Sequence, residues 1–542
     1  NSAGPNSGNT QGNQATSAPS NQPTQTPPGA PIQCSAHTSN PVTLNMYYGS
    51  EKQAWINDVV MDFNSHNYAA CDGGITVKAT PIGSGQSMQQ ILDGTIKPDV
   101  WSPAGAVWLT LINADWREKT GADLIGTGAN DAPSLVTSPI VIAMWKPEAQ
   151  ALGWPNKPIG WSDIAKLSTD PRGWSAYGHP EFGAFKFGHT HPDYSNSGLD
   201  AIIAMNYAGA NKARGLTSDD VNNPTTKSFV GNVESSVIHY GDSTGFFADK
   251  MFSKGPSYLS ATVMYENLVV EANEGKKYPN LAFPAVAIYP KEGTFYSDHP
   301  YAVLQASWVT PAKKAAAQAF RQFLLDAPQQ RKALQYGFRP ADLTIKLAAP
   351  IDTNHGVDPT QPKATLPIPN ADVVRSIKAS WQEQKRKVDV MLILDRSGSM
   401  QDDVGGISKI DGAKQGLQEF VKLLSDNDQL GLTVFSDSSD VISPISLLGP
   451  KRQDMLSRIS NVVPGGSTRL YDTISDQVKA LQGQSSKGIK AVVVLTDGMD
   501  TSSNTYQSAD QLVGSVAASG EDAGIGVKVF SIAYGSDADK AG

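Results

Sequence analysis

Small oxygen-bearing side chains follow an apolar segment in the last third of the chain. The sequence D-R-S-G-S-M at 395–400 comes directly after V-D-V-M-L-I-L and offers Asp395, Ser397 and Ser399. A turn or a helix cap would explain one or two of these side chains, because Ser and Asp favour such positions. A hard divalent cation would explain all three, because it prefers carboxylate and hydroxyl oxygens. We therefore expect a cation site here, with turn and cap residues as the alternative.

Two later residues extend this oxygen set. Thr468 lies in the Gly-rich segment P-G-G-S-T-R-L-Y-D, and Asp497 in L-T-D-G-M-D follows the apolar run A-V-V-V-L-T. Ligands of open parallel sheets bind beyond the carboxyl ends of the strands, so these side chains are expected to meet Asp395 there. All-oxygen coordination favours Mg²⁺ first, then Mn²⁺ or Ca²⁺, and the absence of soft ligands disfavours zinc. No nearby His or Glu stands out as a general base, which disfavours a hydrolytic metal site.

The elements around these residues predict a parallel α/β sheet. Its strands are V-D-V-M-L-I-L, L-G-L-T-V-F, A-V-V-V-L-T and V-K-V-F-S-I-A, separated by amphipathic helices. Residues 388–542 resemble a von Willebrand factor A domain, which implies a Rossmann-like doubly wound fold. D-R-S-G-S matches the D-x-S-x-S motif of that family, and G-G-S-T-R-L-Y-D and L-T-D-G-M-D resemble its second and third motif segments in the same order.

The resemblance implies a metal-ion-dependent adhesion site. Ser397, Ser399 and Thr468 would ligate the ion directly, and Asp395 and Asp497 would act mainly through water. An open coordination position would accept a carboxylate from a partner protein. The chain stops at Gly542, soon after its last strand, whereas the family usually continues with another strand and a final helix.

A second α/β region precedes this one. Residues 34–350 resemble a two-lobed extracellular solute-binding protein of the periplasmic type II class. The likeness rests on an opening strand–helix pattern and on several loose motifs, which are I-G-S-G-Q-S-M-Q-Q-I, K-P-D-V-W-S, V-M-Y-E-N-L-V-V and the crossing segment T-S-P-I-V-I-A-M. Such a fold implies an interlobe cleft in which helix N-termini and hydroxyls hold a small polar or anionic solute. The candidates, each of which has a helix cap as its alternative, are Ser50, Ser84, Ser102, Ser138, Ser197 and Tyr265.

Two other motifs suggest chemistry of a different class. G-D-S-T-G at 241–245 fits the nucleophile elbow of a serine hydrolase, but Ser243 would also need a positioned His and acid, and His239 alone does not mark a triad. G-H-T-H-P-D at 188–193 offers His189 and His191 as metal ligands without further Cys or His nearby. A strand-to-helix turn and a loop at the cleft mouth are the favoured interpretations, so we expect binding without catalysis.

Length and composition set the organisation. A chain of 542 residues predicts two or three domains. Residues 1–33 contain no charged or aromatic side chain and predict a disordered tether, and residues 351–387 predict a linker followed by a charged docking helix. The net charge of −8 argues against a general nucleic-acid binder.

The expected location is the outer face of a bacterial membrane. No apolar run reaches the ~18 residues of a membrane helix, so a lipid or membrane anchor would have preceded Asn1. An extracellular setting favours a disulfide between Cys34 and Cys71, with free thiols as the alternative. The predicted function is metal-dependent binding of a protein partner, with a transporter-associated solute receptor as the main alternative.

Overall fold

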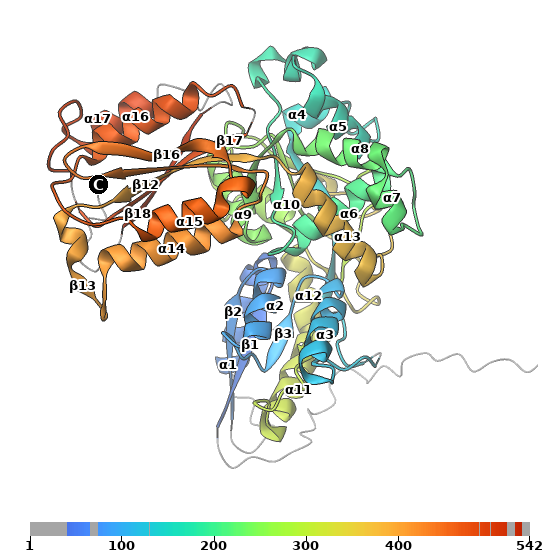
Figure 1. The fold of residues 1–542 in the computed structure, drawn as a ribbon. Helices are drawn as coiled ribbons and strands as arrows, with labels where there is room; N and C mark the ends of the chain where they lie inside the picture. Colours follow the sequence, from blue (N-terminus) through green and yellow to red (C-terminus); the bar gives the residue numbers. More distant parts are fainter. Residues whose placement is uncertain are drawn as a thin grey trace, which may run out of the picture.

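The computed structural model describes residues 41–65, 74–128, 130–486, 488–498, 500–517 and 526–533. The expected tether over 1–33 and both cysteines, Cys34 and Cys71, lie outside these ranges. Within them, no helix is long and apolar enough to cross a membrane. Figure 1 shows two lobes, in blue to yellow and in green, with a third α/β unit in orange and red beside the green lobe.

The first lobe is a four-stranded sheet in the order β10-β3-β1-β2, in which only β10 is antiparallel to its neighbour. Its strands are β1 (Val42–Tyr48), β2 (Ile75–Pro81), β3 (Val100–Ser102) and β10 (Ala302–Val303). Its helices are α1 (Gln53–Ser65), α2 (Ser84–Asp93), α3 (Val107–Thr120), α11 (Pro311–Leu325) and α12 (Ala327–Gln335). The apolar stripe of α1, Trp55, Val59 and Phe63, is fully buried against this sheet.

The second lobe is built around the long strand β4 (Val136–Trp145), which begins in the core of the first lobe and ends in that of the second. Its other strands are β5 (Phe187–Thr190), β6 (Val237–Gly241), β7 (Ala261–Tyr265), β8 (Ala285–Ile288), β9 (Tyr296–Ser297) and β11 (Arg339–Pro340). Strand β4 is antiparallel to β7, β8, β9 and β11, and only β5 pairs in parallel with β6 and β7. The sheet of the second lobe is therefore mixed, because β4 crosses from the other lobe and enters the sheet in the opposite direction.

The helices of the second lobe surround this sheet. They are α4 (Lys146–Ala151), α5 (Trp161–Thr169), α6 (Asn196–Gly209), α7 (Ser218–Asn222), α8 (Pro224–Glu234), α9 (Thr244–Lys254) and α10 (Glu266–Asn273). Helix α13 (Ala371–Gln384), which lies within the segment expected to be a linker and docking helix, packs on α6, α7 and α8 (Figure 1). Its buried face consists of Val373, Val374, Ile377 and Trp381.

The C-terminal unit is a five-stranded sheet in the order β16-β15-β12-β17-β18. The strands are β12 (Val388–Asp395), β15 (Gln429–Phe435), β16 (Ser439–Leu447), β17 (Ile489–Thr496) and β18 (Lys528–Ala533). All pairs are parallel except β15–β16, a hairpin edge that the sequence pattern did not reveal. A small hairpin, β13 (Asp403–Val404) with β14 (Ile407–Ser408), follows β12.

Helices cover both faces of this sheet. Alternate residues of β12 face opposite sides, as the pleat of a strand requires. Val390, Leu392 and Leu394 pack on α14 (Lys409–Leu423) and α15 (Arg452–Ser460). Met391 and Ile393 pack on α16 (Leu470–Gln482) and α17 (Ala509–Ala517). The doubly wound architecture predicted for this region is confirmed.

Candidate functional site

The end of strand β12 is the centre of the predicted cation site. Strands β12 and β17 are parallel neighbours in register, so both finish at the same edge of the sheet. Thr496, the last residue of β17, donates a hydrogen bond from Oγ1 to Asp395 Oδ2 at 2.6 Å. Asp395 therefore ends one central strand and Asp497 follows the adjacent one.

The two serines connect these carboxylates. The Ser397 backbone N–H donates to Asp395 Oδ1 at 2.7 Å, which turns the chain back across the strand end. Ser397 Oγ lies 3.2 Å from Ser399 Oγ, and Ser399 Oγ donates to Asp497 Oδ1 at 2.9 Å. Four of the five predicted side chains thus form one continuous oxygen cluster.

Thr468 reaches this edge on a separate loop. The loop passes the β12 end through two backbone hydrogen bonds, Gly398 N–H to Gly466 O at 2.9 Å and Gly465 N–H to Arg396 O at 2.6 Å. Gly465 and Gly466 have φ of 154° and 98°, which disfavours any side chain at these positions. Thr468 itself is buried, and its carbonyl oxygen accepts from the Thr501 N–H at 2.8 Å.

The donor set fits a hard divalent cation. Neighbouring oxygens of an octahedral Mg²⁺ site are roughly 3 Å apart, because each lies about 2.1 Å from the ion. The distance of 3.2 Å between Ser397 Oγ and Ser399 Oγ, two of the predicted direct ligands, matches such an edge. Burial raises the pKa of Asp395, and the negative charge of Asp497 adds to this effect, so a cation would relieve the repulsion between two buried carboxylates.

Lys409 is a member of this site that sequence reasoning missed. Its Nζ lies 2.8 Å from Asp497 Oδ2, and both side chains are buried. The segment S-K-I-D could have located the start of α14, since Ser408 caps that helix through a bond from the Asp411 N–H. Nothing in the local sequence showed that the lysine turns toward the strand ends.

The six predicted cleft residues lie buried where the lobes meet, and the hydroxyls of four of them bond to neighbouring residues outside the set. Ser50 Oγ contacts Ser243 Oγ of the other lobe and accepts from the Gly245 N–H at 3.0 Å. Ser197 Oγ lies 2.8 Å from Thr244 Oγ1. The Ser84 hydroxyl accepts from the Ala104 N–H at 3.0 Å.

The other three predicted cleft residues differ in their partners. Ser138 bonds to Asn267 at 3.3 Å, farther along the crossing strand. The hydroxyls of Ser102 and Tyr265 are buried without a hydrogen-bond partner among the described residues. Such hydroxyls are uncommon in protein interiors, and they make these two the strongest solute-binding candidates of the six.

Backbone groups also join the lobes directly. Helix α2 begins beside the second lobe, and the N–H groups of Gly85 and Gln86 donate to Tyr194 O at 2.9 and 3.1 Å. A Cβ at Gly85 would lie 2.1 Å from Asp193 O, so only glycine allows this approach. The N-terminus of α2, an expected solute-binding feature, is thus bonded to the opposite lobe.

A buried ionic cluster in the first lobe was also missed. Lys52 Nζ lies 2.8 Å from Glu51 Oε1 and 3.2 Å from His299 Nδ1, and all three side chains are buried. Although burial alone would raise it, the charges and hydrogen bonds of Lys52 and His299 lower the pKa of Glu51 to about 2. The ionised Glu51 carboxylate offsets the charge of this lysine, so the two side chains form a buried ion pair.

The two alternative motifs have ordinary structural positions. Ser243 occupies the N-cap of α9, and within the described ranges no hydrogen bond links it to a histidine. His239, the nearby histidine in sequence, stacks on Tyr258 with ring centroids 4.0 Å apart. His189 Nε2 lies 2.9 Å from Glu234 Oε1, and His191 stacks on Tyr194. In the part of the chain that the structure describes, no three His, Cys, Asp or Glu side chains gather as metal ligands.

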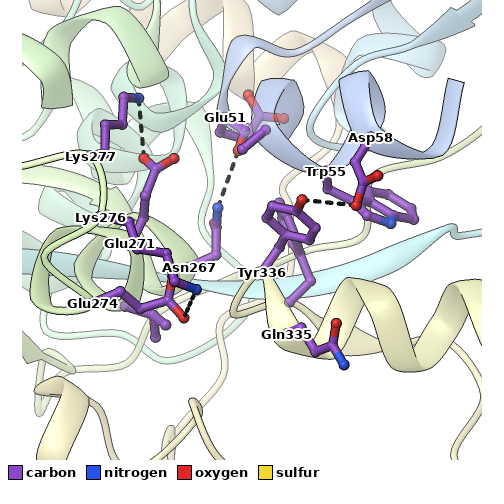
Figure 2. Close-up of a pocket in the computed structure, with 13 residues that line it drawn as sticks. Glu51, Trp55, Asp58, Asn267, Glu271, Glu274, Lys276, Lys277, Gln335 and Tyr336 are labelled. Carbon is purple, nitrogen blue, oxygen red and sulfur yellow. Dashed lines mark hydrogen bonds and ion pairs between the residues drawn. The ribbon is translucent and has the colours of Figure 1, made fainter. Parts of the chain in front are cut away.

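A cavity of about 470 Å³ lies beside the lobe junction, and its lining includes Asn267, the partner of Ser138. Figure 2 shows it between α1, α10 and the segment that follows α12, with Asp58, Glu271 and Tyr336 in its wall. Tyr336 donates to Asp58 Oδ2 at 2.9 Å, and Lys277 lies 3.3 Å from Glu271 Oε2. Its charged groups therefore pair with one another.

Comparison with known proteins identifies both regions. Residues 44–339 match the family model for the bacterial extracellular solute-binding protein. The chain belongs to the bacterial extracellular solute-binding protein family. Residues 390–499 of this solute-binding protein match the model for the von Willebrand factor type A domain, which confirms both resemblances inferred from the sequence.

Individual relatives are distant. The uncharacterized proteins YwmC and YwmD of Bacillus subtilis (strain 168) are 25% identical over 143 residues and 28% identical over 131 residues. The matches cover 24% and 22% of this solute-binding protein and 63% and 58% of the relatives, so the chain spans about three-fifths of their length.

Solved structures with similar folds include a periplasmic thiamin binding protein, with 15% identity, a TM-score of 0.45, and coverage of 66% of this chain and 99% of that one. A ferric binding protein from Campylobacter jejuni has 14% identity, a TM-score of 0.42, and coverage of 62% of this chain and 97% of that one.

Asp200 should make the stability of the solute-binding domain depend on pH. Its Oδ2 accepts from Asn196 Nδ2 at 2.7 Å, its Oδ1 has no partner among the described residues, and burial raises its pKa to about 8. The folded state therefore keeps a proton that the unfolded state releases near pH 4. The Asp200 carboxyl then contributes its full stabilisation below pH 4, and this stabilisation is lost as pH rises through about 8. Asp200→Asn should reduce this loss of stability with rising pH. At pH 9 its free energy of unfolding should exceed that of the wild type by up to about 5 kcal/mol.

Urea unfolding at pH 5, 7 and 9 measures this effect. Glu148→Gln is the matched comparison, because burial also raises the pKa of Glu148 to about 8 at another position. Identical pH profiles for the wild type and Asp200→Asn would contradict the assignment.

Proposed function

We propose that this protein binds a partner protein at the bacterial cell exterior through a divalent cation held by its C-terminal domain. The presence of a solute-binding domain and a von Willebrand factor A domain supports a receptor or adhesion-type protein. The observation that carries the metal-dependent part is the continuous oxygen cluster of Asp395, Ser397, Ser399 and Asp497 at one sheet edge. We propose that a lipid or membrane anchor holds the protein at the cell surface.

The neutral and the charged side chains of this site would have different roles. Ser397, Ser399 and Thr468 would hold Mg²⁺ through neutral oxygens, with Mn²⁺ or Ca²⁺ as other candidates. Asp395 and Asp497 would orient these hydroxyls and bound water, as outer partners of a metal site do. Because few anionic ligands touch the ion, it would retain positive charge and attract a carboxylate from the partner.

Titration calorimetry with Mg²⁺ and Mn²⁺ on metal-stripped protein tests this proposal. Wild type should bind saturably, and Asp395→Ala should weaken binding by about 10- to 100-fold or more, since it removes an outer partner of the site. Asp454→Ala is the control, because Asp454 is an exposed residue of α15 that pairs with Arg458. The proposal would be contradicted if the wild type showed no saturable Mg²⁺ or Mn²⁺ binding, or if Asp395→Ala bound these ions equally well.

A solute receptor is the second candidate function. It is favoured by the buried hydroxyls of Ser102 and Tyr265, which have no hydrogen-bond partner among the described residues. These groups suit a small polar or anionic solute. This candidate requires a tight small ligand in the solute-binding domain, whereas adhesion requires Asp395 and a divalent ion.

A further inference from the structure

Lys409 is the first residue of helix α14, and its side chain points into the cation site. Its side chain is 2% exposed, that of Asp497 is 1% exposed, and their charged atoms are 2.8 Å apart. A second carboxylate, Asp402, lies 3.7 Å away, but it is 66% exposed and is screened by solvent. Lys409 is therefore a counter-charge of the site itself and not part of a surface ion pair.

The backbone fixes this lysine firmly. The Lys409 N–H donates to Asp402 O at 2.9 Å, which closes the loop containing the β13–β14 hairpin. Ser408 caps α14 by accepting from the Asp411 N–H at 3.2 Å. The helix N-terminus therefore starts at the same sheet edge as the oxygen cluster, and its first side chain enters that cluster.

The two oxygens of Asp497 have different partners. Oδ1 accepts from Ser399, whereas Oδ2 accepts from Lys409. Lys409 thus offsets the charge of Asp497 without occupying the oxygen that faces the hydroxyls. The formal charges of Asp395, Asp497 and Lys409 sum to one negative charge, so a bound divalent ion would leave the site with one net positive charge. Without Lys409, the loaded site would be neutral.

We propose that Lys409 sets the charge of this metal site, lowering its affinity for the divalent cation and raising the affinity of the loaded site for a partner's carboxylate. This inference rests on the proposed metal-dependent function. It follows from charge and burial together. The Lys409 ammonium and the divalent ion repel each other strongly in a low-dielectric site, which lowers the affinity for the ion. The excess positive charge of the loaded site attracts the partner's carboxylate. Lys409 is accordingly a specificity-determining residue of the site.

The test compares the full chain with Lys409→Met, which keeps the length of the side chain and removes its charge. Free Mn²⁺ measured by electron paramagnetic resonance should show a rise in Mn²⁺ affinity of about tenfold or more, because the variant lacks a positive charge that repels the ion. Acetate serves as the carboxylate probe, and its binding to Mn²⁺-loaded protein is followed by water-proton relaxation. Acetate affinity should fall by a similar factor.

Two further variants guard against misfolding and nonspecific effects. Lys409→Gln is neutral but keeps a hydrogen-bond donor, so it should reproduce both shifts if charge is the cause. Lys414→Met removes a lysine from the same helix that pairs with the exposed Asp411, and it should change neither affinity. A purely structural role for Lys409 would instead weaken Mn²⁺ binding in both the Met and Gln variants.

The outcomes separate this inference from the function on which it rests. If the wild type binds Mn²⁺ but neither Lys409 variant binds it more tightly, the metal site stands and the role of Lys409 is wrong. A rise in Mn²⁺ affinity with unchanged acetate affinity overturns the partner-binding half of the inference. If neither the wild type nor any variant binds Mn²⁺, the proposed function fails and the inference fails with it.

Discussion

Replacing Trp381 with alanine should lower the free energy of unfolding of the solute-binding domain by about 3–5 kcal/mol, the usual range for a buried Trp. The indole is buried between α13 and the second lobe, and its Nε1–H donates to Glu234 Oε1 at 2.8 Å. Its ring packs on His191 and Tyr240, with centroids 4.9 and 5.6 Å apart. Alanine would leave both a cavity and a buried carboxylate with one partner fewer.

Helix α13 should detach at least in part when this side chain is lost. Arg386, shortly after the helix, donates to the Tyr240 hydroxyl and to Val237 O, both at 3.2 Å, so α13 and the residues after it link the second lobe to β12. Hydrogen exchange over residues 371–384 should accelerate in Trp381→Ala. Trp381→Phe is the control, because it keeps most of the ring and removes only the bond to Glu234, at a cost of about 1–3 kcal/mol. Unchanged exchange in Trp381→Ala would show that Val373, Val374 and Ile377 hold the helix without the indole.

Breaking the Glu266–Arg339 pair is the second change with a large expected effect. Arg339 donates from Nε and Nη2 to the two oxygens of Glu266, both at 2.8 Å, and both side chains are buried. Glu266→Gln would leave the guanidinium without its counter-charge and should destabilise the protein by about 3–5 kcal/mol in urea unfolding. Because β11, which contains Arg339, pairs with the start of β4, the loss should be concentrated at the strand that crosses between the lobes.

A double variant separates the cost of an unpaired charge from the value of the pair. Glu266→Met with Arg339→Met removes both charges and should recover much of the stability lost in either single variant. Additive losses in the double variant would mean that the two side chains contribute independently, contrary to this account.

The sequence predicted the architecture well wherever the strands are apolar and their neighbours are close in the chain. The four apolar strands of the C-terminal unit were found, whereas β16, S-D-V-I-S-P-I-S-L, was missed because polar residues and a proline interrupt it. The mixed direction of the second-lobe sheet was also missed. Strand direction there depends on β4 entering from the other lobe, which no local pattern encodes.

The candidate sites show the same limit. Asp395, Ser397 and Ser399 lie within five residues at the end of a strand, and parallel strand ends converge. Four of the five predicted oxygen side chains were therefore brought into one cluster. Lys409 and Lys52 were not identified, because the direction of a long side chain depends on packing between distant segments. The metal itself, the partner and the Cys34–Cys71 disulfide remain predictions.

The hydrogen bonds from Gly85 and Gln86 to the Tyr194 carbonyl have a kinetic consequence. A solute that binds at the N-terminus of α2 must first wait for the second lobe to release those N–H groups. Its capture rate would climb with solute concentration only until it equals the frequency of lobe opening, and it would then reach a plateau. Substitutions that weaken these hydrogen bonds between the lobes would raise the maximal capture rate, even at positions that do not contact the solute.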